Sequence, residues 1–222
     1  VTLLSPGDAL PANAAHLTAT MLKPIDGAED LARLLGDVRL KAFVLGPGFG
    51  DAQKARDYVR LIAAHGRSLV LDADGISAFR DDPEALFSLF ANGGANLVLT
   101  PHDGEFARLF PDLAADETLS KIDRAQKAAA RSNAAVILKG ADTVIAAPDG
   151  RVLVNENAPL WLATAGSGDV LAGIVGAHLA QGLPAFEAAA SAVWRHGEAG
   201  RIAGEGLTAK DLPPAIPPWP TA

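Results

Sequence analysis

The stretch LATAGSGDVLAGIVGAHLAQG, residues 162–182, is the most informative part of this chain. Its small-residue turn GSGD, residues 166–169, leads directly into an apolar helix expected over Asp169–Gln181. Backbone N–H groups at such a helix start point the same way, and the helix dipole adds partial positive charge there. We call residues 166–169 the anion turn, because this geometry is suited to bind a phosphate.

Asp169 is unusual in this turn, because a carboxylate is repelled by a neighbouring phosphate. A carboxylate is useful here if it accepts a proton from an attacking hydroxyl group. Together, the anion turn and the base predict phosphoryl transfer to an alcohol. The alternative is an ordinary glycine-rich helix start in which Asp169 acts as a cap.

Composition narrows the class of protein. The 222 residues fit one large α/β domain, and 49% hydrophobic and 20% charged residues are ordinary for a globular protein. The net charge of −7 argues against a nucleic-acid partner, which requires a basic face. The sequence has no cysteine, which excludes thiolate catalysis and fits a reducing, cytoplasmic setting. It contains no apolar run of about eighteen residues, so we expect no membrane span.

Apolar, β-rich runs alternate with helical stretches over most of the chain, which predicts βαβ units around a mainly parallel sheet with helices on both faces. The expected strands are Lys41–Leu45, Ser68–Leu71, Ala95–Thr100, Ala134–Leu138, Thr143–Ala147 and Arg151–Val154. The expected helices are Ala52–His65, Pro83–Ala91, Ser120–Ser132, Asp169–Gln181 and Ala185–Ala203.

The last two expected strands form a hairpin, because Pro148-Asp149-Gly150 between them is a turn sequence. The sheet is therefore expected to be mixed. We assign residues 1–212 to one domain and residues 213–222 to a proline-rich tail, which cannot continue a helix.

Four further segments follow expected strands, where open α/β sheets bind ligands. The first is the glycine loop GPGFG, residues 46–50. Its spacing fits a dinucleotide-binding fingerprint poorly, and Pro47 removes a needed N–H, so we favour a loop lining another ligand over a purely structural turn. The second, LVLDADGI (residues 69–76), carries Asp72 and Asp74, which either contact a metal or polar ligand or cap the following helix.

The third segment is TPHDGE, residues 100–105. His102 offers a hydrogen bond to a substrate, and Glu105 offers an oxygen to Mg²⁺ through water. The alternative is a surface histidine beside a capping acid. The fourth segment, VILKGADT (residues 136–143), places Lys139 at the end of a buried strand, either near a phosphate or snorkelling to solvent.

In this order, the segments resemble the ribokinase-like NAD(P)H-hydrate dehydratases. The resemblance rests on NAAHLT from Asn13, GPGFG from Gly46, LDAD from Leu71, LTPHDGEFAR from Leu99, LKG from Leu138, Asn157, LATAGSGDVLAG from Leu162 and AVWRHG from Ala192. It covers residues 1 to about 212. It implies a three-layer α/β sandwich and ADP- or ATP-dependent dehydration of NAD(P)H hydrate, through phosphorylation of the ring hydroxyl and loss of phosphate.

The resemblance also implies residue roles. Asp169 would be the catalytic base and, with Gly48 and His102, would contact the hydrate. The nucleotide side would be formed by Lys139, Gly140, Ala141, Asp142, Thr143, Gly166, Ser167 and Gly168. Mg²⁺ would bridge the phosphates, with Glu105 in its outer shell. A homotetramer and a fused epimerase domain are further expectations.

Two departures from the family pattern stand out. Asp103 replaces a usual proline, so the loop is expected to be less rigid. Family members also carry a first βα unit before the point that matches Val1, so we expect this chain to be part of a longer protein. Two other functions stay open at this stage: a ribokinase-like kinase of a vitamin-precursor alcohol, and a non-catalytic nucleotide-binding domain.

Overall fold

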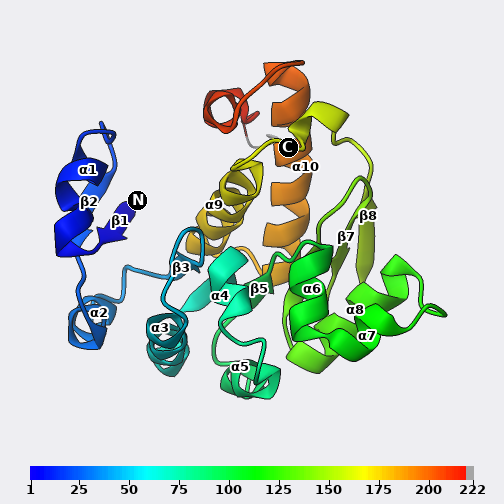
Figure 1. Cartoon of the computed structure of the whole chain (residues 1–222), viewed down its shortest axis with the longest axis horizontal. Coiled ribbons are helices and arrows are strands. Elements are labelled where there is room, and N and C mark those ends of the chain that lie inside the picture. Colours follow the sequence, from blue (N-terminus) through cyan, green and yellow to red (C-terminus); the bar gives the residue numbers. More distant parts are fainter. Residues whose placement is uncertain (219–222) are drawn as a thin grey trace. The chain divides into compact units, whose positions relative to one another are not determined.

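The computed structural model describes residues 1–218 and contains two compact units, residues 1–40 and the part of the chain from Lys41 onward (Figure 1). The assignment of residues 1–212 to a single domain stays a prediction. No helix among the described residues is both long and apolar enough to cross a bilayer.

The first unit is built on a two-stranded parallel sheet, in which Thr2 pairs with Met21. Asn13 donates a hydrogen bond to the buried Ser5 hydroxyl at 2.7 Å and so ties a helix to the end of the first strand. The elements of this unit are β1 (Thr2–Ser5), η1 (Gly7–Ala9), α1 (Leu10–Ala14), β2 (Met21–Pro24) and α2 (Ala28–Leu35).

The second unit holds a six-stranded sheet whose strand order follows the chain, β3-β4-β5-β6-β7-β8. Strands β3 to β6 are parallel, and β7 and β8 continue the sheet antiparallel. The strands are β3 (Ala42–Leu45), β4 (Ser68–Leu71), β5 (Leu97–Leu99), β6 (Ala135–Leu138), β7 (Thr143–Ala146) and β8 (Val152–Asn155). The predicted mixed sheet with a terminal hairpin is confirmed.

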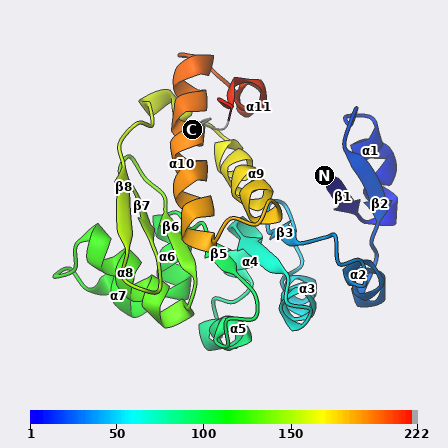
Figure 2. The ribbon, with the colours of Figure 1, turned by 180° about the vertical axis from the view of Figure 1, so that it is seen from behind.

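Helices cover both faces of this sheet. They are α3 (Ala52–Ala64), α4 (Ala73–Ser77), α5 (Pro83–Phe90), α6 (Asp103–Leu109), α7 (Pro111–Ala115), α8 (Lys121–Ser132), α9 (Ser167–Ala180), α10 (Ala185–Ala203) and α11 (Leu212–Ala215), with the 3-10 helices η2 (Leu160–Leu162) and η3 (Ala209–Asp211). Helices α9 and α10 lie across one face, as Figure 2 shows from behind, while α3 and α8 pack on the other.

Burial on both sides explains the apolar strands. Val70 and Val98 join the core beneath α9 and α10, whereas their neighbours Leu69 and Leu99 point to the opposite face. All four side chains are fully buried. A strand that is buried on both faces has a continuous apolar sequence. The sheet with a helix layer on each face therefore makes three layers.

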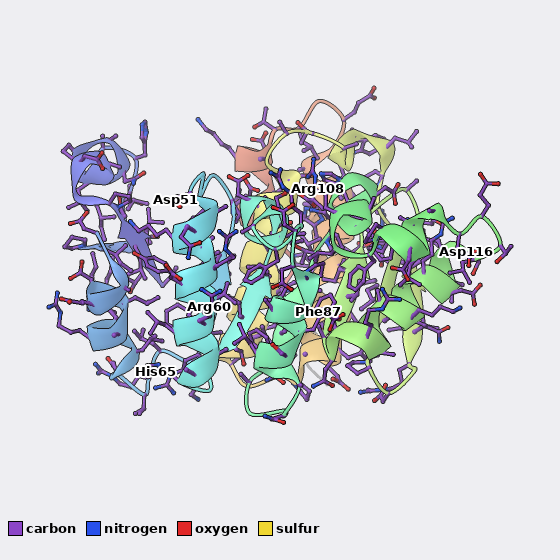
Figure 3. All side chains as sticks on the ribbon, turned by 60° about the horizontal axis from the view of Figure 1, so that its bottom comes forward. Asp51, Arg60, His65, Phe87, Arg108 and Asp116 are labelled. Atoms are coloured by element: carbon purple, nitrogen blue, oxygen red, sulfur yellow. The ribbon has the colours of Figure 1, made fainter. Side chains whose placement is uncertain are left out.

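The helices begin where the sequence provides caps. The Asp51 side chain accepts from the N–H of Lys54 at 3.0 Å and starts α3, and Ser120 starts α8 in a reciprocal capping box with Asp123. Figure 3 shows Asp51 at one end of α3 and His65 at the other. These caps place the loops that follow the strands at defined positions.

The expectation for the tail is wrong at its start. Residues 212–215 form the short helix α11, with prolines in its first turn, where a missing N–H costs nothing. Further on, Arg195 donates two hydrogen bonds to the Pro217 carbonyl, at 3.1 and 2.6 Å. The rest of the predicted tail, residues 219–222, lies outside the described residues.

Candidate active site

Four of the segments singled out in the sequence, all except the anion turn, follow β3, β4, β5 and β6. Because these strands are parallel and adjacent, their carboxyl ends lie at one edge of the sheet. The glycine loop packs onto the next segment there: a Cβ on Gly46 would lie 1.8 Å from the Asp72 carbonyl oxygen, and Gly50 N–H donates to Asp74 at 3.0 Å. Gly48, between them, is exposed with φ +63°. The loop therefore rests on the Asp72 segment with Gly48 facing outward.

Asp72 does not cap the following helix with its side chain, and its contact with a metal or polar ligand stays a prediction. Its carboxylate is 2% exposed and accepts from the Lys139 ammonium at 2.9 Å, and it makes no side-chain cap on α4. Sixty-seven residues separate the two partners. Lys139 therefore does not snorkel: it is held at the sheet edge by a buried carboxylate.

Glu105 is a second buried acid on the same ammonium. Its Oε2 lies 3.7 Å from Lys139 Nζ and accepts from His102 N–H at 2.9 Å. His102 caps α6, because its Nδ1 accepts from Gly104 N–H at 3.0 Å and from Glu105 N–H at 3.3 Å. The structure thus shows the capping acid of the alternative, and it shows that His102 is a cap as well. The His102 side chain is still 55% exposed, so it stays available to a ligand.

The anion turn is open at the start of α9. Gly166 is the N-cap residue, with φ +82°, and no side chain caps the first turn. The N–H of Ser167 donates to the Thr164 carbonyl at 3.2 Å. The N–H groups of Gly168 and Asp169 have no partner inside the helix, so they are available to a ligand. A Cβ built on Gly168 would lie 3.5 Å from Lys139 Nζ, which places the ammonium next to this turn.

Asp169 stands in the first turn of α9 and is exposed. Partial desolvation raises the pKa of its carboxyl group, the negative charge of Asp72 raises it further, and the Lys139 ammonium opposes both. A carboxylate with a raised pKa is a stronger base. The buried Asp72–Lys139 pair therefore acts electrostatically on the predicted base.

His196, on α10, was not singled out from the sequence, although it lies in the AVWRHG segment. It is buried, makes a hydrogen bond with the backbone of Ser167, and its Nε2 has no hydrogen-bond partner. Desolvation lowers its pKa to about 4, so the imidazole is neutral at pH 7. A neutral buried histidine thus lies against the anion turn.

Two other residues near the predicted nucleotide side gave no sequence signal. Lys121, from α8, donates to the carbonyl and carboxylate of Asp142 at 2.6 and 2.8 Å. The Ala209 Cβ lies 3.1 Å from the position of a Cβ on Gly166. Both contacts join distant parts of the chain, so no local pattern could have indicated them.

The structure thus brings together Asp72, His102, Glu105, Lys139, Gly168 and Asp169 at one end of the sheet. Within residues 1–218, no group of three or more His, Asp or Glu side chains is arranged to hold a metal ion. The catalytic and binding roles expected for individual residues stay predictions.

The fold class follows from solved structures. The arrangement is that of the ribokinase-like proteins, as expected from the sequence. A Bacillus subtilis ADP/ATP-dependent NAD(P)H-hydrate dehydratase, co-crystallised with ATP and Mg²⁺, matches with a TM-score of 0.72 and 23% identity. The match covers 96% of this chain and 77% of that one.

Within that class, the chain belongs to the NAD(P)H-hydrate dehydratase family, whose model matches residues 1–216. It is 45% identical over 191 residues to the bifunctional NAD(P)H-hydrate repair enzyme of Gloeobacter violaceus, a match covering 84% of this chain and 36% of that protein. It is 39% identical over 199 residues to the ADP-dependent (S)-NAD(P)H-hydrate dehydratase of Neisseria meningitidis, covering 86% and 66%. The chain spans about one third and just under two thirds of the length of these relatives.

Proposed function

We propose that this chain catalyses the nucleotide-dependent dehydration of NAD(P)H hydrate and so repairs a damaged cofactor. The observation that carries the proposal is the arrangement at the start of α9. There an uncapped anion turn, the Lys139 ammonium and the base candidate Asp169 occur together. Membership of the dehydratase family supports this substrate over a vitamin-precursor alcohol.

In the proposed reaction, the Asp169 carboxylate accepts the proton of the ring hydroxyl as its oxygen attacks the terminal phosphorus of the nucleotide. The bond between that phosphorus and the bridging oxygen breaks, and the shortened nucleotide leaves. The ring nitrogen lone pair then expels phosphate, and loss of a ring proton restores the reduced nicotinamide. Phosphorylation is needed because hydroxide is a poor leaving group.

The anion turn and Lys139 stabilise the transferring phosphoryl group in this mechanism. Backbone N–H groups held in a helix start need no reorganisation when charge develops on the phosphoryl oxygens. Lys139 is prevented from swinging away by its 2.9 Å contact with Asp72. The positive groups are therefore positioned before the nucleotide arrives.

The chemistry of the acidic side chains fits Mg²⁺. Asp72 and Glu105 are buried carboxylates that share the Lys139 ammonium. Two negative charges against one positive charge leave a net negative charge at this place. Hydrated Mg²⁺ prefers one or two carboxylates together with phosphate oxygens. We assign Glu105 to its outer shell, where the ion, when bound, would neutralise phosphate charge.

His102 and Gly48 are the proposed contacts to the hydrate. The His102 side chain is 55% exposed, so its ring can contact the hydrate. Its Nδ1 is occupied as an acceptor, and its Nε2 lies 3.3 Å from Glu105 Oε1. Gly48 presents backbone without a side chain, which permits close approach of the hydrate ring. On the nucleotide side, residues 139–143 complete the proposed site.

The proposal extends to the oligomeric state, the location and an associated domain. We infer a homotetramer acting in the cytoplasm and, because one relative is named a bifunctional repair enzyme, association with an epimerase domain. Sedimentation analysis of the purified chain tests the oligomer directly: a monomer at micromolar concentration would contradict the tetramer.

The proposed function is tested by identifying the phosphorus-containing products. The chain is mixed with NADH hydrate, Mg²⁺ and ADP, and products are followed by phosphorus NMR. The proposal predicts one inorganic phosphate and one AMP for each NADH formed. A stable phosphoester without phosphate release would indicate an alcohol kinase instead, and nucleotide binding without any product would indicate a non-catalytic domain.

A further inference from the structure

The segment after β6 is held by a lysine from outside it. Lys121, the first residue of α8, donates to Asp142 twice, to the carbonyl oxygen at 2.6 Å and to Oδ1 at 2.8 Å. Its side chain is 23% exposed, so it is largely packed in place. We call residues 139–143 the nucleotide loop, after their predicted role.

Gly140 shows how closely the loop is built around this ammonium. A Cβ on Gly140 would lie 2.3 Å from Lys121 Nζ, so a larger residue there would displace the lysine. On the other side, the Thr143 hydroxyl donates to the Gly140 carbonyl at 3.1 Å. One lysine and one threonine therefore fix the path of the loop between β6 and β7.

The same loop begins with Lys139, which reaches the anion turn. Lys139 N–H donates to the Pro101 carbonyl at 2.9 Å, and its ammonium lies beside Asp72 and Gly168. A loop fixed at Lys139 by the segment after β5 and at Asp142 by α8 has little conformational freedom. Less entropy is then lost when a ligand binds to its backbone.

We propose that Lys121 is a positioning residue for the adenine nucleotide, holding the nucleotide loop in its binding conformation through Asp142. This inference rests on the proposed function, because it assumes that the loop contacts the nucleotide. It assigns Lys121 no contact with the reacting atoms. It places a determinant of nucleotide affinity on α8, outside every motif of the sequence.

The test is Lys121→Met, with Lys127→Met as the matched control. Lys127 lies on the same helix and is exposed, so its replacement removes the same charge without touching the loop. For Lys121→Met we expect the KM for ADP to rise about tenfold, while the KM for NADH hydrate stays unchanged and kcat at saturating ADP falls less than twofold. For Lys127→Met, all three parameters stay at the wild-type values.

Asp142→Asn approaches the same pair from the loop and leaves α8 intact. Asp142→Asn keeps the bond from Lys121 to the backbone carbonyl, so if both variants act through this contact, the double variant will weaken ADP binding no more than Lys121→Met alone. Equal ADP affinity in wild type and Lys121→Met, or additive effects in the double variant, would overturn the inference while leaving the proposed function standing. A wild-type chain that binds no ADP would overturn both.

Discussion

At the residue scale, the site is organised around one ammonium. Lys139 lies between the buried acids Asp72 and Glu105 and next to Gly168, so its charge is shared between a carboxylate pair and the anion turn. Asp169 responds to the same charges, since Asp72 raises its pKa and Lys139 lowers it. Substitutions at these positions should therefore change the charge that acts on Asp169.

Asp169→Asn tests the base. Asparagine keeps the shape of the side chain but cannot accept the hydroxyl proton, so we expect kcat to fall by about a thousandfold. The Kd for ADP, measured by calorimetry, should stay within a factor of about three, because the N–H groups of the turn are unchanged. A variant with near-normal turnover would exclude Asp169 as the base.

Asp72→Asn tests the electrostatic coupling. Removing the Asp72 charge removes a cause of the raised Asp169 pKa and frees the Lys139 charge, and both changes lower that pKa. Since the base must be deprotonated, activity is lost as pH falls through its pKa. The acid limb of the kcat profile should therefore shift to lower pH in Asp72→Asn, and a limb that stays in place or moves upward would contradict the coupling.

His196 links pH to stability. Burial lowers its pKa from 6.5 to about 4, so the folded state favours the neutral ring. The contribution of the neutral His196 ring to the free energy of unfolding is fully present above pH 6.5. As the pH falls from 6.5 toward 4, this contribution is lost, by on the order of 3 kcal/mol. His178, whose pKa burial also lowers, adds to the same trend.

The measurement is urea unfolding at several pH values, followed by tryptophan fluorescence. All three tryptophans follow residue 160 in the sequence, as His196 does, so the signal reports on the part of the chain that contains His196. Wild type should lose stability between pH 6.5 and 4, and His196→Asn should lose less over that interval. Identical pH profiles would show that His196 is not the titrating group.

At the scale of elements, α10 and α9 offer a matched pair of glycines. Gly197 in α10 lies against Asn157, whose Oδ1 would be 2.0 Å from an added Cβ. Asn157 donates to the Trp194 carbonyl at 2.9 Å and to Glu198 at 3.1 Å, and so ties the segment after β8 to α10. Gly173 in α9 has no atom within 4 Å of an added Cβ.

Gly197→Ala should therefore displace Asn157 and lower the free energy of unfolding by about 1–2 kcal/mol, after the gain in helix propensity. Gly173→Ala gains propensity with no clash and should raise it by about 0.5–1 kcal/mol. Denaturation midpoints by circular dichroism give both values. A stable Gly197→Ala variant would mean that the Asn157 contacts contribute little.

Elements were predictable where the pattern was regular. The strands and long helices of the second unit could be assigned because apolar runs, caps and turn residues agree with one another. β2, with one half-buried and three exposed residues, has no apolar run to reveal it. The proline-rich sequence from Pro213 does not predict the helical turn found there, because proline breaks a helix interior, although the first turn accepts it.

At the scale of the whole molecule, the sequence indicated which loops meet but not how their side chains pair. Parallel topology alone places Asp72, His102 and Lys139 at one edge, so this grouping was predictable. The Asp72–Lys139 pair spans 67 residues and the Lys121–Asp142 pair spans 21. The first pair depends on side chains that meet across the ends of β4 and β6, and the second on how α8 packs against the sheet, and no local motif encodes either contact.

The most direct test of the central claim is the near-ultraviolet absorbance of reduced nicotinamide after the chain is mixed with NADH hydrate and Mg²⁺. The account predicts no rise until ADP or ATP is added, then a steady rise that Asp169→Asn abolishes at equal nucleotide saturation. A rise without nucleotide, or an undiminished rise with Asp169→Asn, would contradict phosphoryl transfer at the start of α9 as the origin of the activity.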